Sequence, residues 1–188
     1  MMVDCREIAA NIGFFKKMKR YLQRKTFRMD IHIRKAEKSD MQAVLDLIIE
    51  LAVYENEPDA VQITVSDLEK AGFGANPLFT CVVAEVNAKV VGMALVYFRF
   101  STWVGQTVHL EDLVVQERMR GKGVGEALYT KVMEYADEQG VKRVQWVVLD
   151  WNNGAIKFYE RSGATILNNW WQVEMNEASL HNYLKRNK

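Results

Sequence analysis

The segment Leu110–Gly125 most strongly constrains how this chain can fold. A mainly apolar stretch, typical of a strand, runs directly into a basic turn with three glycines, and an amphipathic stretch follows the turn. Glycine permits the positive φ and close backbone approach that such a tight turn requires. The first N–H groups of a helix have no partner within it and lie at the positive end of its dipole. The pattern therefore predicts a strand–turn–helix unit that can bind phosphate; a plain connection is the simpler alternative.

The glycine spacing in this turn differs from that of two common nucleotide-binding loops. A P-loop requires Gly-Lys followed by Ser or Thr, but here Gly121-Lys122 is followed by Gly123. A dinucleotide fingerprint requires G-x-G-x-x-G, which these glycines do not match. The pattern that remains is Arg120-x-x-Gly123-x-Gly125, with Lys122 as a further positive charge.

The rest of the chain alternates between helix and strand patterns, which indicates one α/β domain. Strands are predicted at Ile31–Ile33, Cys81–Val86, Val90–Phe100, Val108–Val115, Val144–Leu149 and Trp170–Met175. Helices are predicted around Val44–Ala52, after Thr64, at Glu126–Gln139 and at Asn153–Arg161. A Ser39-x-x-Gln42 capping box marks the start of the first helix, and Asn87-Ala-Lys predicts a hairpin between two strands.

Residues 1–28 differ from the rest of the chain in charge. They hold eight basic and two acidic residues, whereas residues 29–188 hold 17 basic and 22 acidic residues. Apolar residues at helical spacing among the basic ones predict an amphipathic helix of the kind that lies on anionic membranes. The alternative is that translation starts at Met29, where the domain pattern begins. We therefore expect an N-terminal extension at 1–28 and one domain at 29–188.

Composition narrows the classes of function. No apolar run reaches the roughly 20 residues that a membrane span requires. Two cysteines are too few for a disulfide framework, and the three histidines lack metal-ligand spacing. We therefore expect a cytoplasmic protein with no metal and no membrane span. The acidic character of residues 29–188 suits a cationic amine better than a nucleic acid.

Two segments together resemble the Gcn5-related N-acetyltransferases: Arg120-x-x-Gly123-x-Gly125, and a helix pattern with Asn152, Phe158-Tyr159 and Gly163-Ala164. The resemblance runs from about Ile31 to Leu184 and is strongest to the spermidine/spermine and thialysine branch. Its further matches are Leu51-Ala-x-Tyr-Glu55, Gly72-Phe-Gly-x-x-Pro77, Cys81–Val86, Tyr97-Phe98, Trp103-x-Gly105 and Leu110-Glu-Asp112. The resemblance implies an α/β (α+β) domain with a mixed, mostly antiparallel twisted sheet. About six to seven strands and about four helices are expected, with a V-shaped opening between the two central strands.

The resemblance also implies that acetyl-CoA is the co-substrate. The residues expected to bind it are Leu113, Val114, Val115, Arg120, Gly121, Lys122, Gly123, Val124, Gly125, Asn152 and Tyr159. Tyr159 corresponds to the tyrosine that donates a proton to the CoA sulfur, and a core aromatic is its alternative role. Members of this branch are typically homodimers, and we expect the same here.

Acetyl transfer to an amine requires that the amine lose a proton. An amine with a pKa near 10.4 is less than about one part in a thousand neutral at pH 7, so a base is needed. Glu111 and Asp112 interrupt an apolar strand, and strand alternation predicts that their side chains lie on opposite faces. In the related branch the matching glutamate is proposed to draw the proton through water. A charged bulge on a half-exposed strand is the alternative.

The resemblance places further residues around the acceptor amine. These are Tyr54, Glu55, Trp103, Glu111, Asp112 and Trp170, with Trp171 as the alternative to Trp170. Aromatic rings and carboxylates suit an ammonium group. Two departures stand out: Ser101-Thr102 replaces Asp-Pro before the tryptophan, and Asn153-Gly154 replaces Glu-Pro after Asn152. The lost carboxylate weakens the case for a long polycation.

The leading hypothesis is an N-acetyltransferase that acts on a small cationic amine, either a diamine, a polyamine or a lysine-like amino acid. The second hypothesis is acetylation of a protein lysine or N-terminus. The third is a non-catalytic acyl-CoA-binding module, against which the presence of both Tyr159 and Glu111 argues.

Overall fold

The computed structural model describes residues 29–186, and the predicted extension at 1–28 lies outside them. The chain divides into two compact units, one ending at Trp146 and one beginning at Val147. The strands are β1 (His32–Lys35), β2 (Thr80–Val86), β3 (Lys89–Ser101), β4 (Gly105–Val115) and β5 (Val144–Gln145). The helices are α2 (Met41–Tyr54), α3 (Val65–Phe73), α4 (Val124–Glu138), α5 (Asn153–Arg161) and α6 (Glu177–Arg186), with 3₁₀ turns at Lys38–Asp40 and Glu117–Met119.

The five strands form one mixed sheet in the order β1-β2-β3-β4-β5. The first four are antiparallel neighbours, and β5 joins β4 in parallel. The predicted hairpin joins β2 and β3, where Asn87 and Ala88 both have positive φ (51° and 58°), as a two-residue turn between twisted strands requires. The mixed, mostly antiparallel α/β architecture is confirmed, but the described sheet has fewer strands than the six to seven expected.

The ladder between β4 and β5 covers only two residue pairs, Val108–Val144 and His109–Gln145. Strand β4 continues to Val115, where the glycine turn follows. Strand β5 is the edge strand of the described sheet, and the expected V-shaped opening between two central strands stays a prediction. The predicted strand Val144–Leu149 is correspondingly shorter in the structure.

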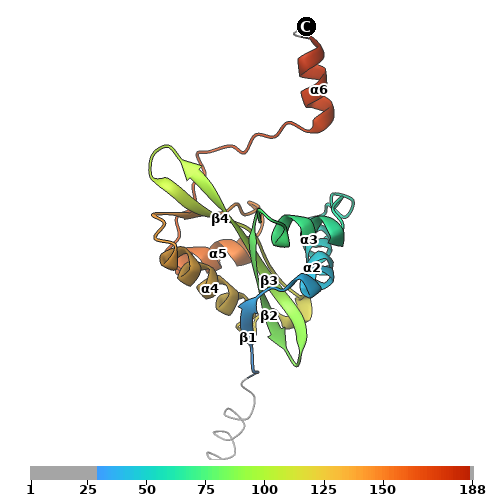
Figure 1. The fold of residues 1–188 in the computed structure, drawn as a ribbon. Coiled ribbons are helices and arrows are strands. Elements are labelled where there is room, and N and C mark those ends of the chain that lie inside the picture. Colours follow the sequence, from blue (N-terminus) through green and yellow to red (C-terminus); the bar gives the residue numbers. More distant parts are fainter. Residues whose placement is uncertain (1–28, 187–188) are drawn as a thin grey trace, which may run out of the picture. The chain divides into compact units, whose positions relative to one another are not determined.

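Helices cover both faces of the sheet (Figure 1). On one face, α4 buries Val124, Leu128 and Val132 against β-strand residues such as Val96 and Leu110. On the other face, α2 and α3 form a second core with strand residues; it contains Met41, Val44, Leu47, Leu68, Cys81, Val83, Met93, Leu95 and Val114. These two cores hold β4 from both sides, so the strand that leads into the glycine turn is fixed.

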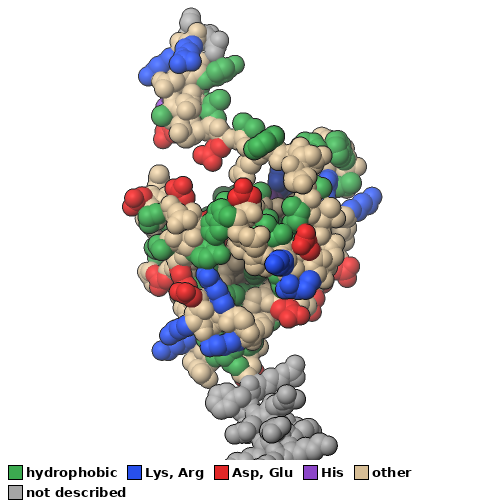
Figure 2. All heavy atoms as spheres, turned by 180° about the vertical axis from the view of Figure 1, so that it is seen from behind, with side chains coloured by type: hydrophobic (Ala, Val, Ile, Leu, Met, Phe, Trp, Pro, Cys, Tyr) green, Lys and Arg blue, Asp and Glu red, His purple; other side chains and the backbone are tan. Residues whose placement is uncertain are grey.

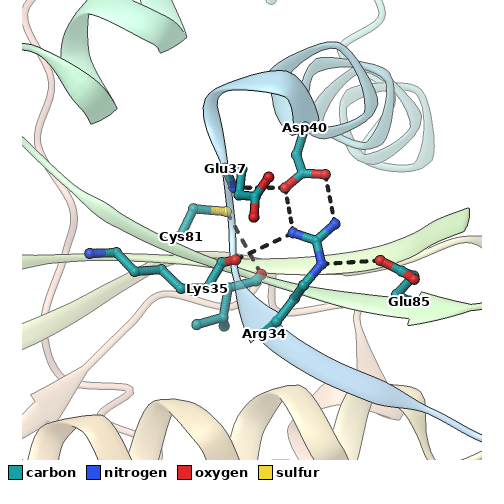
Figure 3. A network of polar contacts seen from close by, with 7 residues as sticks. Arg34, Lys35, Glu37, Asp40, Cys81 and Glu85 are labelled. Carbon is teal, nitrogen blue, oxygen red and sulfur yellow. Dashed lines mark hydrogen bonds and ion pairs between the residues drawn. The ribbon is translucent and has the colours of Figure 1, made fainter. Parts of the chain in front are cut away.

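An ion-pair cluster ties β1 to the start of α2 (Figure 3). The Arg34 guanidinium donates to both carboxylate oxygens of Asp40, at 2.6 and 2.9 Å, and to Glu85 on β2 at 3.0 Å. Asp40 also accepts the Glu37 backbone N–H at 2.7 Å in a capping box of those two residues. The predicted box of Ser39 and Gln42 is therefore wrong, because Glu37 and Asp40 form the box instead.

The second unit contains α5 and α6. Asn152 caps α5 by accepting the Ala155 N–H at 3.2 Å, and Gly163 follows the helix with φ 93°. The structure assigns no strand to 170–175, so that prediction is wrong; α6 was not predicted. Among the described residues this stretch has no strand partner for its backbone groups, and a strand needs one. The surface of residues 170–184 carries large apolar side chains (Figure 2), namely Trp170, Trp171, Val173, Met175, Leu180, Tyr183 and Leu184.

Candidate functional site

The glycine turn after β4 has the geometry of an anion cradle. Gly121 and Gly123 have φ values of 71° and 87°, and a Cβ on either would meet no atom within 4 Å. Positive φ, rather than crowding, is therefore why glycine is needed at these positions, and the space beside the turn is open. Gly123 is the N-cap of α4 and supplies no side chain to cap it.

The first N–H groups of α4 point to the same conclusion. The first backbone bond into the helix runs from the Ala127 N–H to the Gly123 carbonyl. The N–H groups of Val124, Gly125 and Glu126 find no acceptor among the residues that the structure describes. Several uncapped donors at the positive end of a 15-residue helix fit a pyrophosphate. An open groove runs along α4 as far as Glu134, and its lining includes Lys122 and Gly123 at the start of the helix.

Arg120 links the glycine turn to the end of α2. Its Nε donates to the Val115 carbonyl oxygen at 3.2 Å, which fastens the turn to the last residue of β4. Its guanidinium carbon lies 4.6 Å from the centre of the Tyr54 ring, within the range of a cation–π contact. The sequence had assigned Arg120 to acetyl-CoA and Tyr54 to the acceptor, and the structure brings the two residues together.

A β-bulge decides how the acidic pair of β4 is presented. Leu95 of β3 lies opposite Asp112, but the next residue, Val96, lies opposite Leu110. Glu111 is therefore the extra residue of the bulge. Asp112 shares the α2 face with its partner Leu95, and Glu111 bonds Tyr97, which packs on that same face. The prediction that the two carboxylates lie on opposite faces is therefore wrong, because a bulge breaks the alternation.

The bulge gathers three carboxyl groups near the end of α2. Asp112 is partly buried, and burial together with the charges of Glu111 and Glu55 raises its pKa to about 6. Burial also raises the pKa of Glu55, the residue that follows α2. A partly buried carboxyl group whose pKa is raised by burial and by two neighbouring carboxylates is a candidate binding point for a cation.

Three residues that the sequence analysis did not assign to a role complete the surroundings of Glu111. The Tyr97 hydroxyl hydrogen-bonds the Glu111 carboxylate. His109 Nε2 lies 3.6 Å from a Glu111 carboxylate oxygen, and His109 Nδ1 lies 3.2 Å from Arg99 Nη1. All four residues belong to the β3–β4 hairpin. Polar residues at alternate positions of an otherwise apolar strand were the signal that could have identified them.

Trp103, the remaining predicted acceptor residue of the first unit, lies in the turn between β3 and β4 and is 78% exposed. Within the described residues 29–186, no hydrogen bond or ring contact joins it to the three carboxyl groups. Nearby, Ser101 Oγ accepts from the Trp103 N–H at 3.2 Å and from Arg143 Nη2 at 2.6 Å. An arginine thus occupies the surroundings of Ser101, where the related branch carries an aspartate.

The predicted residues of the second unit lie on or after α5. Tyr159 is 8% exposed, and its ring packs edge-on against Phe158 with centroids 5.4 Å apart. Asn152 is the cap of the same helix. Trp170 is 67% exposed. The Tyr159 side chain is thus buried on the regular helix α5, and its ring packs against the Phe158 ring.

Other chemistries find little support in the described residues. Cys81 is buried, and burial raises the pKa of its thiol to about 12, so it is no nucleophile near neutral pH. Residues 29–186 contain no group of three or more His, Cys, Asp or Glu side chains placed to hold a metal. None of the described helices is both long and apolar enough to cross a bilayer.

Comparison with known proteins identifies the group to which the fold and the turn belong. The sequence profile of the acetyltransferase (GNAT) family matches residues 41–164. The thialysine N-epsilon-acetyltransferase of Sus scrofa is 40% identical over 140 residues, which cover 70% of this chain and 82% of the relative. The spermidine/spermine N(1)-acetyltransferase-like protein 1 of Homo sapiens is 35% identical over 158 residues, covering 79% of this chain and 23% of the relative. Among solved structures, the integron cassette protein VCH_CASS6 of V. cholerae superposes with a TM-score of 0.68 at 23% identity, covering 84% of this chain and 99% of the other.

Proposed function

Because the chain belongs to the acetyltransferase (GNAT) family and is an acetyl-CoA-dependent N-acetyltransferase, we propose that its acceptor is the primary amine of a small cationic molecule. The acceptor class is a diamine, a polyamine or a lysine-like amino acid. The names of two relatives support this class: one is a thialysine N-epsilon-acetyltransferase and the other is a spermidine/spermine N(1)-acetyltransferase-like protein. The observation that carries the proposal is the gathering of Glu55, Glu111 and Asp112 on one face of the sheet.

The glycine turn is the proposed site of the acetyl-CoA pyrophosphate. The N–H groups from Gly121 to Gly125 would hold its oxygens, and Arg120 and Lys122 would add positive charge. Residues 113–115 at the end of β4 would bind the pantetheine part, and Asn152 on the second unit is proposed to contribute as well. Bound there, acetyl-CoA supplies the acetyl group as a thioester.

Glu111 is the proposed base. Acting through a water molecule, its carboxylate accepts the proton that the acceptor ammonium must lose before the nitrogen can attack. The nitrogen then forms a bond to the thioester carbonyl carbon, and the carbon–sulfur bond breaks. The extra residue of the bulge suits this role, because the Glu111 side chain is exposed while Leu110 before it is buried and Asp112 after it is partly buried.

Tyr159 is the proposed acid. It gives its hydroxyl proton to the departing CoA sulfur. The nitrogen loses a second proton after it has attacked, and this proton restores the tyrosine, so each turnover releases one proton, the one that Glu111 accepted. The assignment rests on the Phe-Tyr position that this chain shares with its resembling family and on the placement of Tyr159 in a well-formed helix.

The acceptor is proposed to be held by charge and by aromatic rings. Glu55 and Asp112 would pair with its positive groups, and Tyr54 would offer a ring face to an ammonium. Trp103 and Trp170 are proposed to contribute to this site. We further propose a cytoplasmic homodimer, which the apolar surface of 170–184 supports.

The test is CoA release from acetyl-CoA at pH 7 to 9 with spermidine, putrescine, thialysine, lysine and lysine-containing peptides. Turnover of one small amine, abolished in Glu111→Gln, is the expected result. Turnover of peptides alone would replace the proposal with protein acetylation. Tight acetyl-CoA binding without turnover of any amine would favour a binding module.

A further inference from the structure

Arg99 fixes the protonation pattern of the His109 ring. A guanidinium has five N–H donors and no acceptor, so the contact of 3.2 Å between Arg99 Nη1 and His109 Nδ1 requires that Nδ1 accept. A neutral imidazole whose Nδ1 accepts carries its proton on Nε2. The arginine therefore selects one of the two neutral tautomers.

The nitrogen that carries the proton is the one beside the proposed base. Nε2 of His109 lies 3.6 Å from the Glu111 carboxylate, and hydrogen bonds of catalytic groups are often this long before the substrate binds. The Tyr97 hydroxyl donates to the same carboxylate. The Tyr97 and His109 rings also contact each other, with centroids 5.1 Å apart, and the two residues are direct partners across β3 and β4.

We propose that His109 is a positioning residue for Glu111: Arg99 holds its imidazole as the Nε2–H tautomer, and this N–H, together with the Tyr97 hydroxyl, holds the Glu111 carboxylate in place to receive the acceptor's proton. The inference rests on the proposed role of Glu111 as the base. It adds three residues to the proposed site: Arg99 donates to His109, and both His109 and Tyr97 donate to the Glu111 carboxylate.

The neutral state of His109 is consistent with its surroundings. The charged and titratable groups that act on it are Arg99 and Tyr97 from β3 and Glu111 from its own strand, and its parallel neighbour on β5 is the uncharged Gln145. Burial and the Arg99 charge lower the pKa of His109, and the Glu111 charge opposes them. An imidazolium would place its Nδ1–H against the arginine donor, so protonation would break the chain.

The first experiment observes the ring directly and does not depend on activity. Long-range ¹H–¹⁵N spectra of protein with labelled histidine rings distinguish the protonated from the unprotonated nitrogen, and His109→Gln assigns the signal among the three histidines. The Nε2–H tautomer is expected, and the Nδ1–H tautomer would overturn the proposal. In a pH titration, Arg99→Gln should raise the pKa of His109 and Glu111→Gln should lower it. An unchanged pKa in Glu111→Gln would show that the two residues are not coupled.

The second experiment uses kinetics with the acceptor that is turned over. His109→Leu should lower kcat about tenfold, the value of one hydrogen bond to a charged group, without changing the KM for acetyl-CoA. His109→Gln should retain most of the activity, because its amide oxygen can accept from Arg99 while its NH₂ donates to Glu111. His32→Gln, on the exposed face of β1, is the matched control. Equal losses in the Leu and Gln variants would overturn the positioning role.

Arg99→Gln keeps the proposal testable even where His109→Leu fails to fold, since Arg99 is exposed. The acid limb of its kcat/KM profile should move to higher pH, because His109 is then protonated at higher pH and an imidazolium makes Glu111 a weaker base. An unmoved limb would count against the proposal. If no amine is turned over, the proposed function fails, and the ring spectra and titrations still decide whether the chain from Arg99 to Glu111 exists.

Discussion

The Arg120 guanidinium lies over the Tyr54 ring, 4.6 Å from its centre, and so connects the proposed pyrophosphate site to the end of the helix that carries Glu55. We expect Tyr54→Leu to raise the KM for acetyl-CoA about 2- to 5-fold, because a cation–π contact at an exposed site contributes about 0.5–1 kcal/mol. Tyr54→Phe keeps the ring face and should raise the KM less. Initial rates at varied acetyl-CoA concentration check this. Equal effects of the two variants would show that the contact between Arg120 and the ring does not support acetyl-CoA binding.

The two ends of α4 offer a matched pair of glycine substitutions. Gly123 and Gly140 both have positive φ (87° and 64°), with open space where a Cβ would lie. Alanine at either position should cost about 1–2 kcal/mol of unfolding free energy. Only Gly123→Ala should also weaken acetyl-CoA binding measured by calorimetry, because its Cβ projects into the anion cradle. Normal binding by Gly123→Ala would remove the cradle from the proposed site.

Asp112 should make both stability and acceptor binding depend on pH. Its pKa is raised to about 6, above the value of 3.8 for a free side chain, so its ionisation destabilises the fold as the pH rises through about 6. Asp112→Asn should therefore raise Tm at pH 8 but not at pH 4. The corresponding gain in the free energy of unfolding at pH 8 is at most about 3 kcal/mol. The same variant should raise the acceptor KM most at pH 8, where the wild-type carboxylate is charged. A pH-independent difference in Tm would contradict the assignment.

Tyr159→Phe tests the proposed acid. Loss of a general acid typically lowers the rate about 10²-fold or more, and we expect kcat to fall in this range while acetyl-CoA affinity stays nearly constant. Stopped-assay kinetics and calorimetric titration with acetyl-CoA measure the two quantities separately. Tyr135→Phe on α4 is the control for loss of a hydroxyl. A wild-type kcat in Tyr159→Phe would remove the acid role.

The cluster of Arg34, Asp40 and Glu85 should support stability rather than catalysis. The Arg34 hydrogen bonds lower the pKa of Asp40, so its stabilisation is present above the ordinary carboxyl pKa and is lost as the pH falls through the lowered value. Asp40→Asn should cost about 2 kcal/mol at pH 7 by urea unfolding, because it weakens charged hydrogen bonds. Glu69→Gln removes the exposed pair with Lys38 and should change stability by less than about 1 kcal/mol. Equal costs would show that burial of the cluster is unimportant.

The local parts of the fold could be predicted from the sequence because their signals are local. The strand–turn–helix unit around Gly123 is confirmed, since positive φ and apolar periodicity are written into adjacent residues. The helix after Thr64 is confirmed as well, with Thr64 and Asp67 bonded reciprocally as its capping box. The box at Ser39 was wrong because the helical turn begins earlier, with Glu37 as its N-cap and Asp40 as the partner of Glu37, so Ser39 lies inside the turn. Asp40 is also held by Arg34 from β1, a contact that no window along the chain contains.

The presentation of the candidate site could not be predicted for a related reason. Whether Glu111 interrupts the alternation depends on how β4 aligns with β3, and that alignment is set by two cores on opposite faces of the sheet. The pairing of Arg99 with His109 depends on the same alignment. The identities of these residues were visible in the sequence, but the distances between them were not.

Because Glu111 is the extra residue of a bulge, the proposed base can be lost without a change in how β3 and β4 pair. Leu110 and Asp112 already face Val96 and Leu95, two consecutive residues of β3. Deleting Glu111 should therefore make the β3–β4 ladder continuous and leave Leu110 and Asp112 on their present faces of the sheet. Loss of a single codon would thus give a folded protein that keeps the proposed acetyl-CoA site but lacks the proposed base. Gain of a single codon could reverse the change.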